Sequence, residues 1–73
     1  MTPAQQEVLS ILRKHGPLAD HVLVPITQHA GSLHQSSSSI RSRRAELTKA
    51  EKIRRVDSVK MPSGRFAGIY EAV

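Results

Sequence analysis

The chain has 73 residues, no cysteine and a formal net charge of +5 at pH 7. This length allows one small domain (1–73), which excludes a multidomain enzyme. Without cysteine there can be no disulfide, thiolate nucleophile or zinc–thiolate site, and we expect a cytoplasmic protein. The longest apolar stretch, Val22 to Ile26, is far too short to span a membrane.

The positive charge is concentrated in one half of the sequence. Residues 1–35 carry equal numbers of acidic and basic side chains, whereas residues 36–65 carry nine Lys or Arg against three acids, a net +6. This asymmetry is typical of proteins that bind polyanions, because neutralising phosphates releases counterions. Charge alone leaves an equal case for a basic surface that only aids solubility.

The first predicted helix covers residues 3–15. Thr2 is a good N-cap, and Gln5 completes a capping box with it. Pro3 suits the first helical position, because an N–H there would have no acceptor within the helix. Apolar residues follow at three- and four-residue spacing, which predicts one buried face. Gly16 can adopt the left-handed conformation that ends a helix.

A second helix is predicted over residues 21–29, after the connection GPLAD. Asp20 is a suitable N-cap, and the apolar side chains that follow share one helical face. Pro25 removes a backbone donor, so we expect it to kink the helix or to move its start later. Gly31 ends the helix.

The third predicted helix covers residues 37–50 and begins in a run of four serines. Either Ser36 or Ser37 can cap it, because a serine hydroxyl accepts from the free amides of the first turn. Ile40 and Leu47 form a thin apolar seam, and the opposite face is polar and basic. That outward face carries Ser38, Arg41, Ser42, Ala45 and Lys49.

The sequence after the third helix predicts a β-hairpin over residues 53–71. It is rich in β-branched side chains, and MPSG places proline and glycine at the favoured second and fourth positions of a type I turn. The apolar Ile53, Val56 and Val59 do not alternate strictly. We therefore expect a β-bulge or a strand that starts late.

Three helices followed by a hairpin, with the stretch SSSSIRSRRAELTKAEKI, resemble the winged helix-turn-helix family. Ile40, Leu47 and Ile53 correspond to the apolar positions of its recognition helix and first wing strand. More narrowly, S-x-S-x-I-R-S-R-R-A-E-L and a turn at PSGR resemble small winged-helix proteins of actinobacterial bacteriophages and their hosts. The resemblance covers nearly the whole chain. It implies an α+β fold: a three-helix bundle followed by a two-stranded antiparallel wing.

Two positions depart from the family pattern. Glu51 follows the third helix where many relatives have glycine, so the turn must form without a residue that freely adopts positive φ. Arg44 stands about 40° from Ile40 around the helix, where many winged helices have leucine. One interpretation places its stem along the core edge with its guanidinium paired to an acid, which is a structural role, and a DNA contact is the alternative.

The resemblance implies that the third helix enters the major groove while the hairpin contacts neighbouring backbone or the minor groove. Because arginine can pair bidentately with guanine, the outward face supplies the candidates for base contacts: Ser38, Arg41, Ser42, Ala45 and Lys49. Candidates for backbone contacts are Ser36, Ser37, Arg43, Lys60, Ser63 and Arg65. Arg54 and Arg55 point to opposite faces of a strand, so at most one can face DNA.

Catalytic, metal and cofactor chemistry find little support in the sequence. The four histidines have spacings of six, eight and five residues, none of which is the i, i+4 pair of a helical metal site. The carboxylates are scattered, and no serine has a base at a diagnostic spacing. We expect neither an enzyme nor a bound metal or cofactor.

The sequence therefore predicts a double-stranded DNA-binding protein, a small transcriptional regulator or a phage accessory factor. The alternative is a winged-helix protein-interaction module whose basic face meets an acidic partner. RNA or non-B-form DNA is a lesser option, because Phe66 and Tyr70 are the only aromatic residues available for stacking. A homodimer is not indicated; it would have to use the first helix or an exposed edge of the hairpin.

Overall fold

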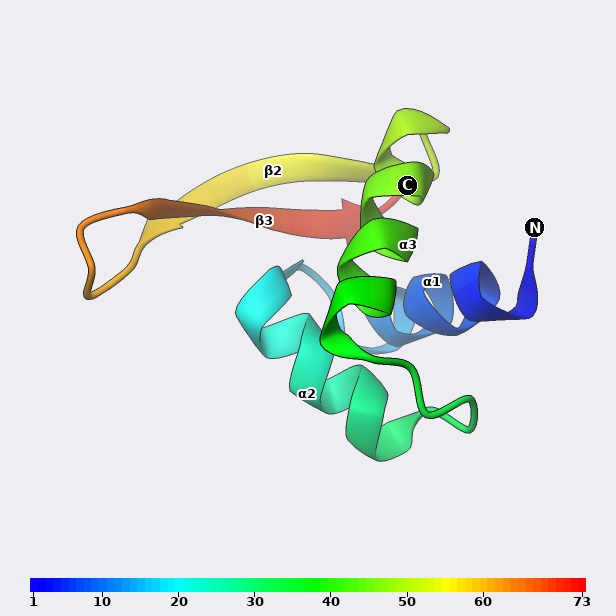
Figure 1. The fold of residues 1–73 in the computed structure, drawn as a ribbon. Coiled ribbons are helices and arrows are strands. Elements are labelled where there is room, and N and C mark those ends of the chain that lie inside the picture. Colours follow the sequence, from blue (N-terminus) through cyan, green and yellow to red (C-terminus); the bar gives the residue numbers. More distant parts are fainter.

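The computed structural model describes residues 1–73 as an α+β fold of three helices and one three-stranded antiparallel sheet (Figure 1). The strand order is β1-β3-β2, and the long β2–β3 hairpin projects beyond the helices. In chain order the elements are α1 (Pro3–His15), β1 (Leu18–Ala19), α2 (Asp20–Ala30), α3 (Ser37–Lys49), β2 (Ile53–Lys60) and β3 (Phe66–Ala72).

Helix α1 has the bounds that the sequence predicts, and its capping box is present. The Gln5 amide donates to Thr2 Oγ1 at 3.2 Å, and the Thr2 amide donates to Gln5 Oε1 at 3.0 Å. At the other end Gly16 has φ 81° as expected, but its ψ of −160° is not that of a left-handed turn. This conformation, open almost only to glycine, leads the chain directly into the extended strand β1.

Strand β1 and the start of α2 differ from the sequence prediction. The connection after α1 pairs with β3, Leu18 opposite Tyr70, so the predicted two-stranded sheet has a third strand. Helix α2 then begins at Asp20, with Ala19 as an N-cap that makes no side-chain bond, and it runs through Pro25. Asp20 is therefore not the cap that we expected, because its carboxylate is bonded to a residue of α3.

Helix α3 begins as predicted and ends one residue early. Ser36 is the N-cap, and its hydroxyl accepts from the Ser39 amide at 3.1 Å. After the C-cap Ala50, the turn toward β2 requires a positive φ, and Glu51 adopts it at 62°. The Lys52 amide then donates to the Leu47 carbonyl at 2.9 Å. Glu51, where many winged helices have glycine, thus adopts the strained left-handed conformation and keeps the same turn.

Replacing Glu51 with glycine is expected to stabilise the fold. The left-handed conformation costs a residue with a Cβ about 1 kcal/mol or more, and glycine adopts it freely. Part of that gain is offset by the greater freedom of glycine in the unfolded chain, so we expect a net gain of roughly 0.5–1 kcal/mol. Urea unfolding measures the difference. An Ala replacement at the same site is the control: it removes the same carboxylate, keeps the strain and should give no such gain.

The β2–β3 hairpin contains the expected irregularity. Its register shifts between Arg55, opposite Tyr70, and Asp57, opposite Ile69, so Val56 is the extra residue of a β-bulge. At the tip, the Gly64 amide donates to the Met61 carbonyl at 2.9 Å, which closes a turn with Pro62 at its second position. Gly64 has φ 88°, in keeping with the glycine of a bulged hairpin loop.

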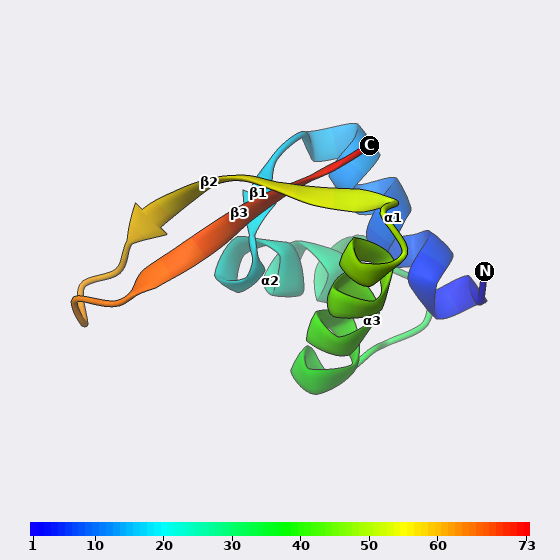
Figure 2. The ribbon, with the colours of Figure 1, turned by 90° about the horizontal axis from the view of Figure 1, so that it is seen from above.

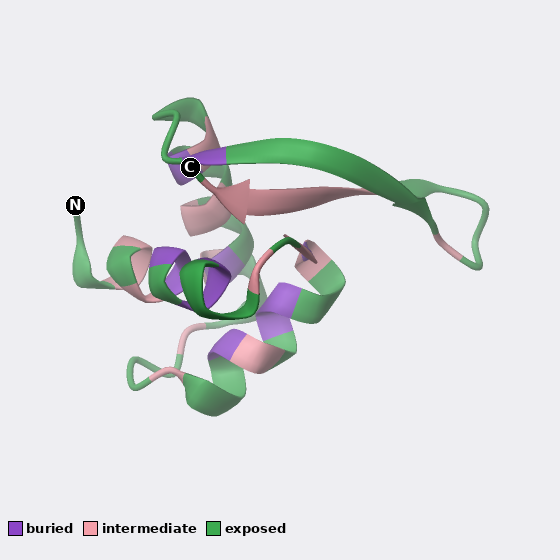
Figure 3. Cartoon of the chain, turned by 180° about the vertical axis from the view of Figure 1, so that it is seen from behind, coloured by how far each residue is buried: buried purple, intermediate pink, exposed green.

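The core lies where the three helices meet the base of the hairpin. Buried positions occupy the facing sides of the helices and the first residue of β2, whereas the rest of β2 is exposed (Figure 3). No helix combines the length and apolarity needed to cross a membrane. The core cluster consists of Val8, Leu9, Ile11, Leu12, Leu23, Val24, Ile40, Leu47 and Ile53.

Candidate nucleic-acid interface

The outward face of α3 carries the five residues that the sequence proposes for base contacts. Apart from the adjacent Arg41 and Ser42, they follow one another at three- and four-residue steps, which places them on one side of a helix. Ile40 and Leu47 are buried on the opposite side, at 0% and 2% exposure. The exposed face is formed by Ser38, Arg41, Ser42, Ala45 and Lys49.

Most basic side chains of residues 36–65 make no ion pair. Salt bridges engage only Arg43, Arg44 and Arg54 among them. The other six are exposed and are here called the unpaired cations: Arg41, Lys49, Lys52, Arg55, Lys60 and Arg65. Glu51 and Asp57 are the acids of this segment outside those salt bridges, so the positive charge predominates locally.

Arg44 links α3 to α2 and to β3. Its Nε and Nη2 donate to the two carboxylate oxygens of Asp20 at 2.8 Å each, and its guanidinium lies 3.9 Å from the centre of the Tyr70 ring. The bonds to Asp20 raise the pKa of Arg44 above its ordinary value even though burial opposes this. Its side chain is only 14% exposed. Arg44 therefore pairs with an acid at the edge of the core and has the structural role that the sequence offered for it.

Arg43 already has a partner within α3. Its Nε donates to Glu46 Oε1 at 2.6 Å, and Gln5 of α1 also donates to that oxygen, at 3.1 Å. The bond from Arg43, followed by the one from Gln5, lowers the pKa of Glu46. A phosphate would have to compete with Glu46 for this guanidinium, so Arg43 is a weaker candidate than the unpaired cations.

Ser36 and Ser37, at the start of α3, have different hydrogen-bond partners. The Ser36 hydroxyl caps the helix, and the Ser37 hydroxyl lies 3.5 Å from Gln28 Nε2 of α2. The first helical amides, those of Ser37 and Ser38, have no intrahelical acceptor, as at any helix start. The proposed phosphate contact of Ser36 and Ser37 is compatible with this arrangement and stays a prediction.

The bulge determines which hairpin cations share a face. Directly opposite residues point the same way, so Arg55 lies on the face of Tyr70 and Lys60 on the face of Phe66. Tyr70 and Phe66 are four residues apart in β3 and share one face. Arg55 and Lys60, five apart in β2, therefore share it too, because Val56 is inserted between them.

The same pairing separates Arg54 from Arg55. Arg54 lies opposite Glu71 on the other face of the sheet and bonds to it, Nη2 to Oε1, at 2.6 Å. Only Arg55 therefore remains free of an acidic partner, and it is a candidate contact that the sequence did not single out. Alternation showed that the two arginines differ, but only the strand register identifies which of them is paired.

The base of the hairpin lies beside α3, whereas its tip projects away from the helices. Seen from above, the hairpin extends past α2, and its tip lies beyond the three helices (Figure 2). Lys60, Ser63 and Arg65 are exposed around the hairpin tip. The structure thus places the predicted helical candidates on α3 and the predicted hairpin candidates around the hairpin tip, with no contact between the two groups.

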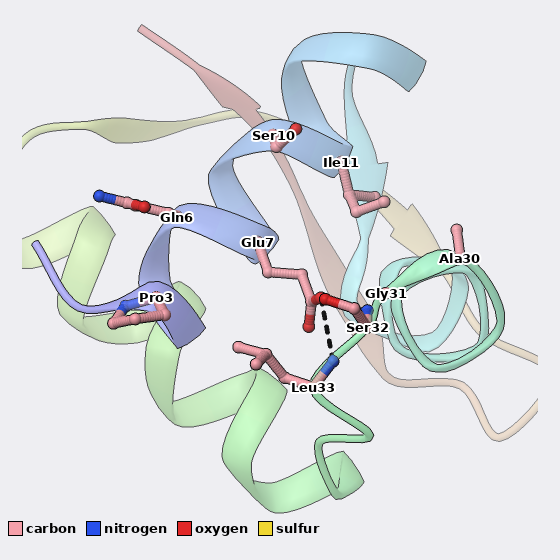
Figure 4. Close-up of a pocket in the computed structure, with 9 residues that line it drawn as sticks. All are labelled: Pro3, Gln6, Glu7, Ser10, Ile11, Ala30, Gly31, Ser32 and Leu33. Atoms are coloured by element: carbon pink, nitrogen blue, oxygen red, sulfur yellow. Dashed lines mark hydrogen bonds between the residues drawn. The ribbon is translucent and has the colours of Figure 1, made fainter.

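Glu7 organises the loop that leads into α3. Its carboxylate accepts from the Ser32 amide at 2.6 Å and from the Leu33 amide at 3.3 Å (Figure 4). It also accepts from Gln35 Nε2 at 2.9 Å. A Cβ at Gly31 would lie 2.5 Å from Glu7 Cδ, so glycine permits this close approach. The bond from Gln35, more than those from the loop amides, lowers the pKa of Glu7.

Replacing Glu7 with glutamine should make the stability of the protein less dependent on acidic pH. Because the folded chain holds the pKa of Glu7 below its ordinary 4.5, the carboxylate stabilises the fold above that pH. This contribution is lost as the pH falls through the folded-state pKa. We expect the variant to be about 1 kcal/mol less stable at pH 7, with the difference shrinking below pH 4.5. Urea unfolding of both proteins across this range measures it, and a constant difference would contradict it.

A pocket lies beside Glu7. It is open, and Glu7 is the only ionisable side chain among its lining residues (Figure 4). No group of three His or acidic side chains in the structure could hold a metal ion.

No protein-family model matches the chain, and no curated protein matches its sequence significantly.

Proposed function

We propose that the protein is a winged helix-turn-helix domain that binds double-stranded DNA. The observation that carries this proposal is the distribution of the six unpaired cations: Arg41 and Lys49 on α3, Lys52 in the turn after it, Arg55 and Lys60 on β2, and Arg65 beside the hairpin tip. Arg43, Arg44 and Arg54 are each paired with an acid, whereas the six unpaired cations are exposed and have no acidic partner. A surface of this kind suits a phosphate backbone.

In this arrangement α3 lies in the major groove and the β2–β3 hairpin is the wing. Arg41 and Lys49 reach base edges or flanking phosphates, with Ser38 and Ser42 beside them, and Ala45 can contact a thymine methyl group. Lys60 and Arg65 neutralise phosphates next to the groove. We further propose that the protein acts in the cytoplasm as a small transcriptional regulator or a phage accessory factor.

A salt titration of binding to mixed-sequence duplex DNA tests the proposal. If most of the six unpaired cations each neutralise one phosphate, log Kobs should fall with log salt with a slope of about −4 to −5. A slope near zero, or no binding at about 50 mM salt, would exclude the DNA-binding function. Tight binding to an acidic protein with no duplex binding would instead support the protein-interaction module.

A further inference from the structure

The tip of the β2–β3 hairpin exposes an aromatic ring between positive charges. Phe66 is 67% exposed, whereas the ring of Tyr70 is partly buried and lies against the Arg44 guanidinium. Lys60 lies directly opposite Phe66 in the neighbouring strand, and Arg65 precedes it in the chain. An exposed phenylalanine flanked by two exposed cations suggests a ligand that is anionic at its edges and apolar within.

Phe66 also lies at the outer end of an otherwise narrow hairpin. It is the first residue of β3 and follows the loop in which Gly64 has no side chain. The Met61 amide donates to the Arg65 carbonyl at 2.6 Å, which closes the loop immediately before Phe66. Phe66 thus begins β3 directly after a hydrogen-bonded loop, and this tip of the hairpin lies away from the three helices (Figure 1).

The strand register shows which way Phe66 faces. It shares a face of β3 with Tyr70, and Tyr70 packs against Arg44 of α3. Lys60 is on the same face, whereas Val59 and Ala67 form a pair on the other one. The ring and its neighbouring cation thus belong to the face that, nearer the body of the molecule, contacts α3.

We propose that Phe66 is a wedge that enters the minor groove and partly unstacks one base-pair step, while Lys60 and Arg65 contact the flanking phosphates. This inference rests on the proposed DNA binding and adds how the hairpin contributes to it. Apolar side chains beside Lys or Arg can unstack and kink duplex DNA from the minor groove. Pyrimidine–purine steps such as TA open most easily, so the wedge favours them.

Phe66→Ala tests the wedge, with Val59→Ala as the matched control on the opposite face. Phe66→Ala should weaken duplex binding about tenfold. The variant loses an apolar contact with DNA, and part of that loss is offset because no base-pair step has to be unstacked. The salt slope should not change, because no charge is removed. A duplex containing 2-aminopurine at TA steps should become more fluorescent with the wild-type protein and with Val59→Ala, but not with Phe66→Ala.

A second readout compares an alternating TA duplex with an A-tract duplex of equal length and charge. The wild-type protein should prefer the alternating duplex, and Phe66→Ala should lose that preference. If wild type and Phe66→Ala bind DNA equally well, the wedge is wrong while the DNA-binding proposal stands. If the wild type binds no duplex, both fail. A dimer in sedimentation that Phe66→Ala dissociates, with unchanged DNA affinity per subunit, would assign the ring to self-association and also overturn the wedge.

Discussion

Replacing Arg44 with alanine is expected to destabilise the protein by about 2–3 kcal/mol. The change removes both bonds to Asp20 and the stacking on Tyr70, and it leaves the Asp20 carboxylate without a cation in a site where it is 25% exposed. A domain this small has a total stability near the low end of 5–15 kcal/mol. Urea unfolding monitored by circular dichroism measures the loss.

The neighbouring arginine provides a matched control for this prediction. Arg43 also bonds to a carboxylate, but Arg43→Ala should have a much smaller effect, because its partner Glu46 is exposed and lies in the same helix. A double-mutant cycle of Arg44→Ala with Asp20→Asn isolates the direct interaction. Coupling near zero, or equal losses from the two arginine variants, would show that Arg44 does not hold the helices and sheet together. Arg44→Lys is the milder substitute if the alanine variant does not fold.

Replacing Arg41 with alanine should reduce discrimination between DNA sequences by about 1–3 kcal/mol, because a bidentate contact to one base pair is lost. Replacing Lys60 with alanine should weaken binding to all sequences alike and reduce the salt slope by about 1, because it removes a phosphate contact. The measurement is the affinity of each variant for a duplex selected from a random pool and for mixed-sequence DNA.

An exposed arginine of α1 is the control for charge alone. Arg13→Ala removes the same charge as Arg41→Ala, but Arg13 is an exposed residue of α1 and belongs neither to the outward face of α3 nor to the hairpin. It should leave both affinity and discrimination nearly unchanged. If Arg41→Ala and Lys60→Ala have the same effect on every sequence, the division between base contacts and backbone contacts is wrong.

The local elements of the fold were largely predictable because their determinants lie within a few residues. The capping box of Thr2 and Gln5 and the serine cap of α3 act through bonds to amides three positions away. Strand β1 could not be predicted, since two residues carry no periodic pattern and pair with a strand some fifty positions later. Asp20 was assigned to the wrong partner for a similar reason: its local use as a cap competes with Arg44, which only folding brings near.

The candidate site was likewise predictable only where it depends on local spacing. Helical spacing alone assigns Arg41, Lys49 and their neighbours to one face of a helix, because that relation needs only the helical period. The strand register determines that Arg54 is paired and Arg55 is not. The register and the bulge at Val56 also place Arg55, Lys60 and Phe66 on one face of the hairpin. These features arise from contacts between elements distant in the chain, so the amino-acid order implies the basic helix, whereas the folded structure assembles the surface around it.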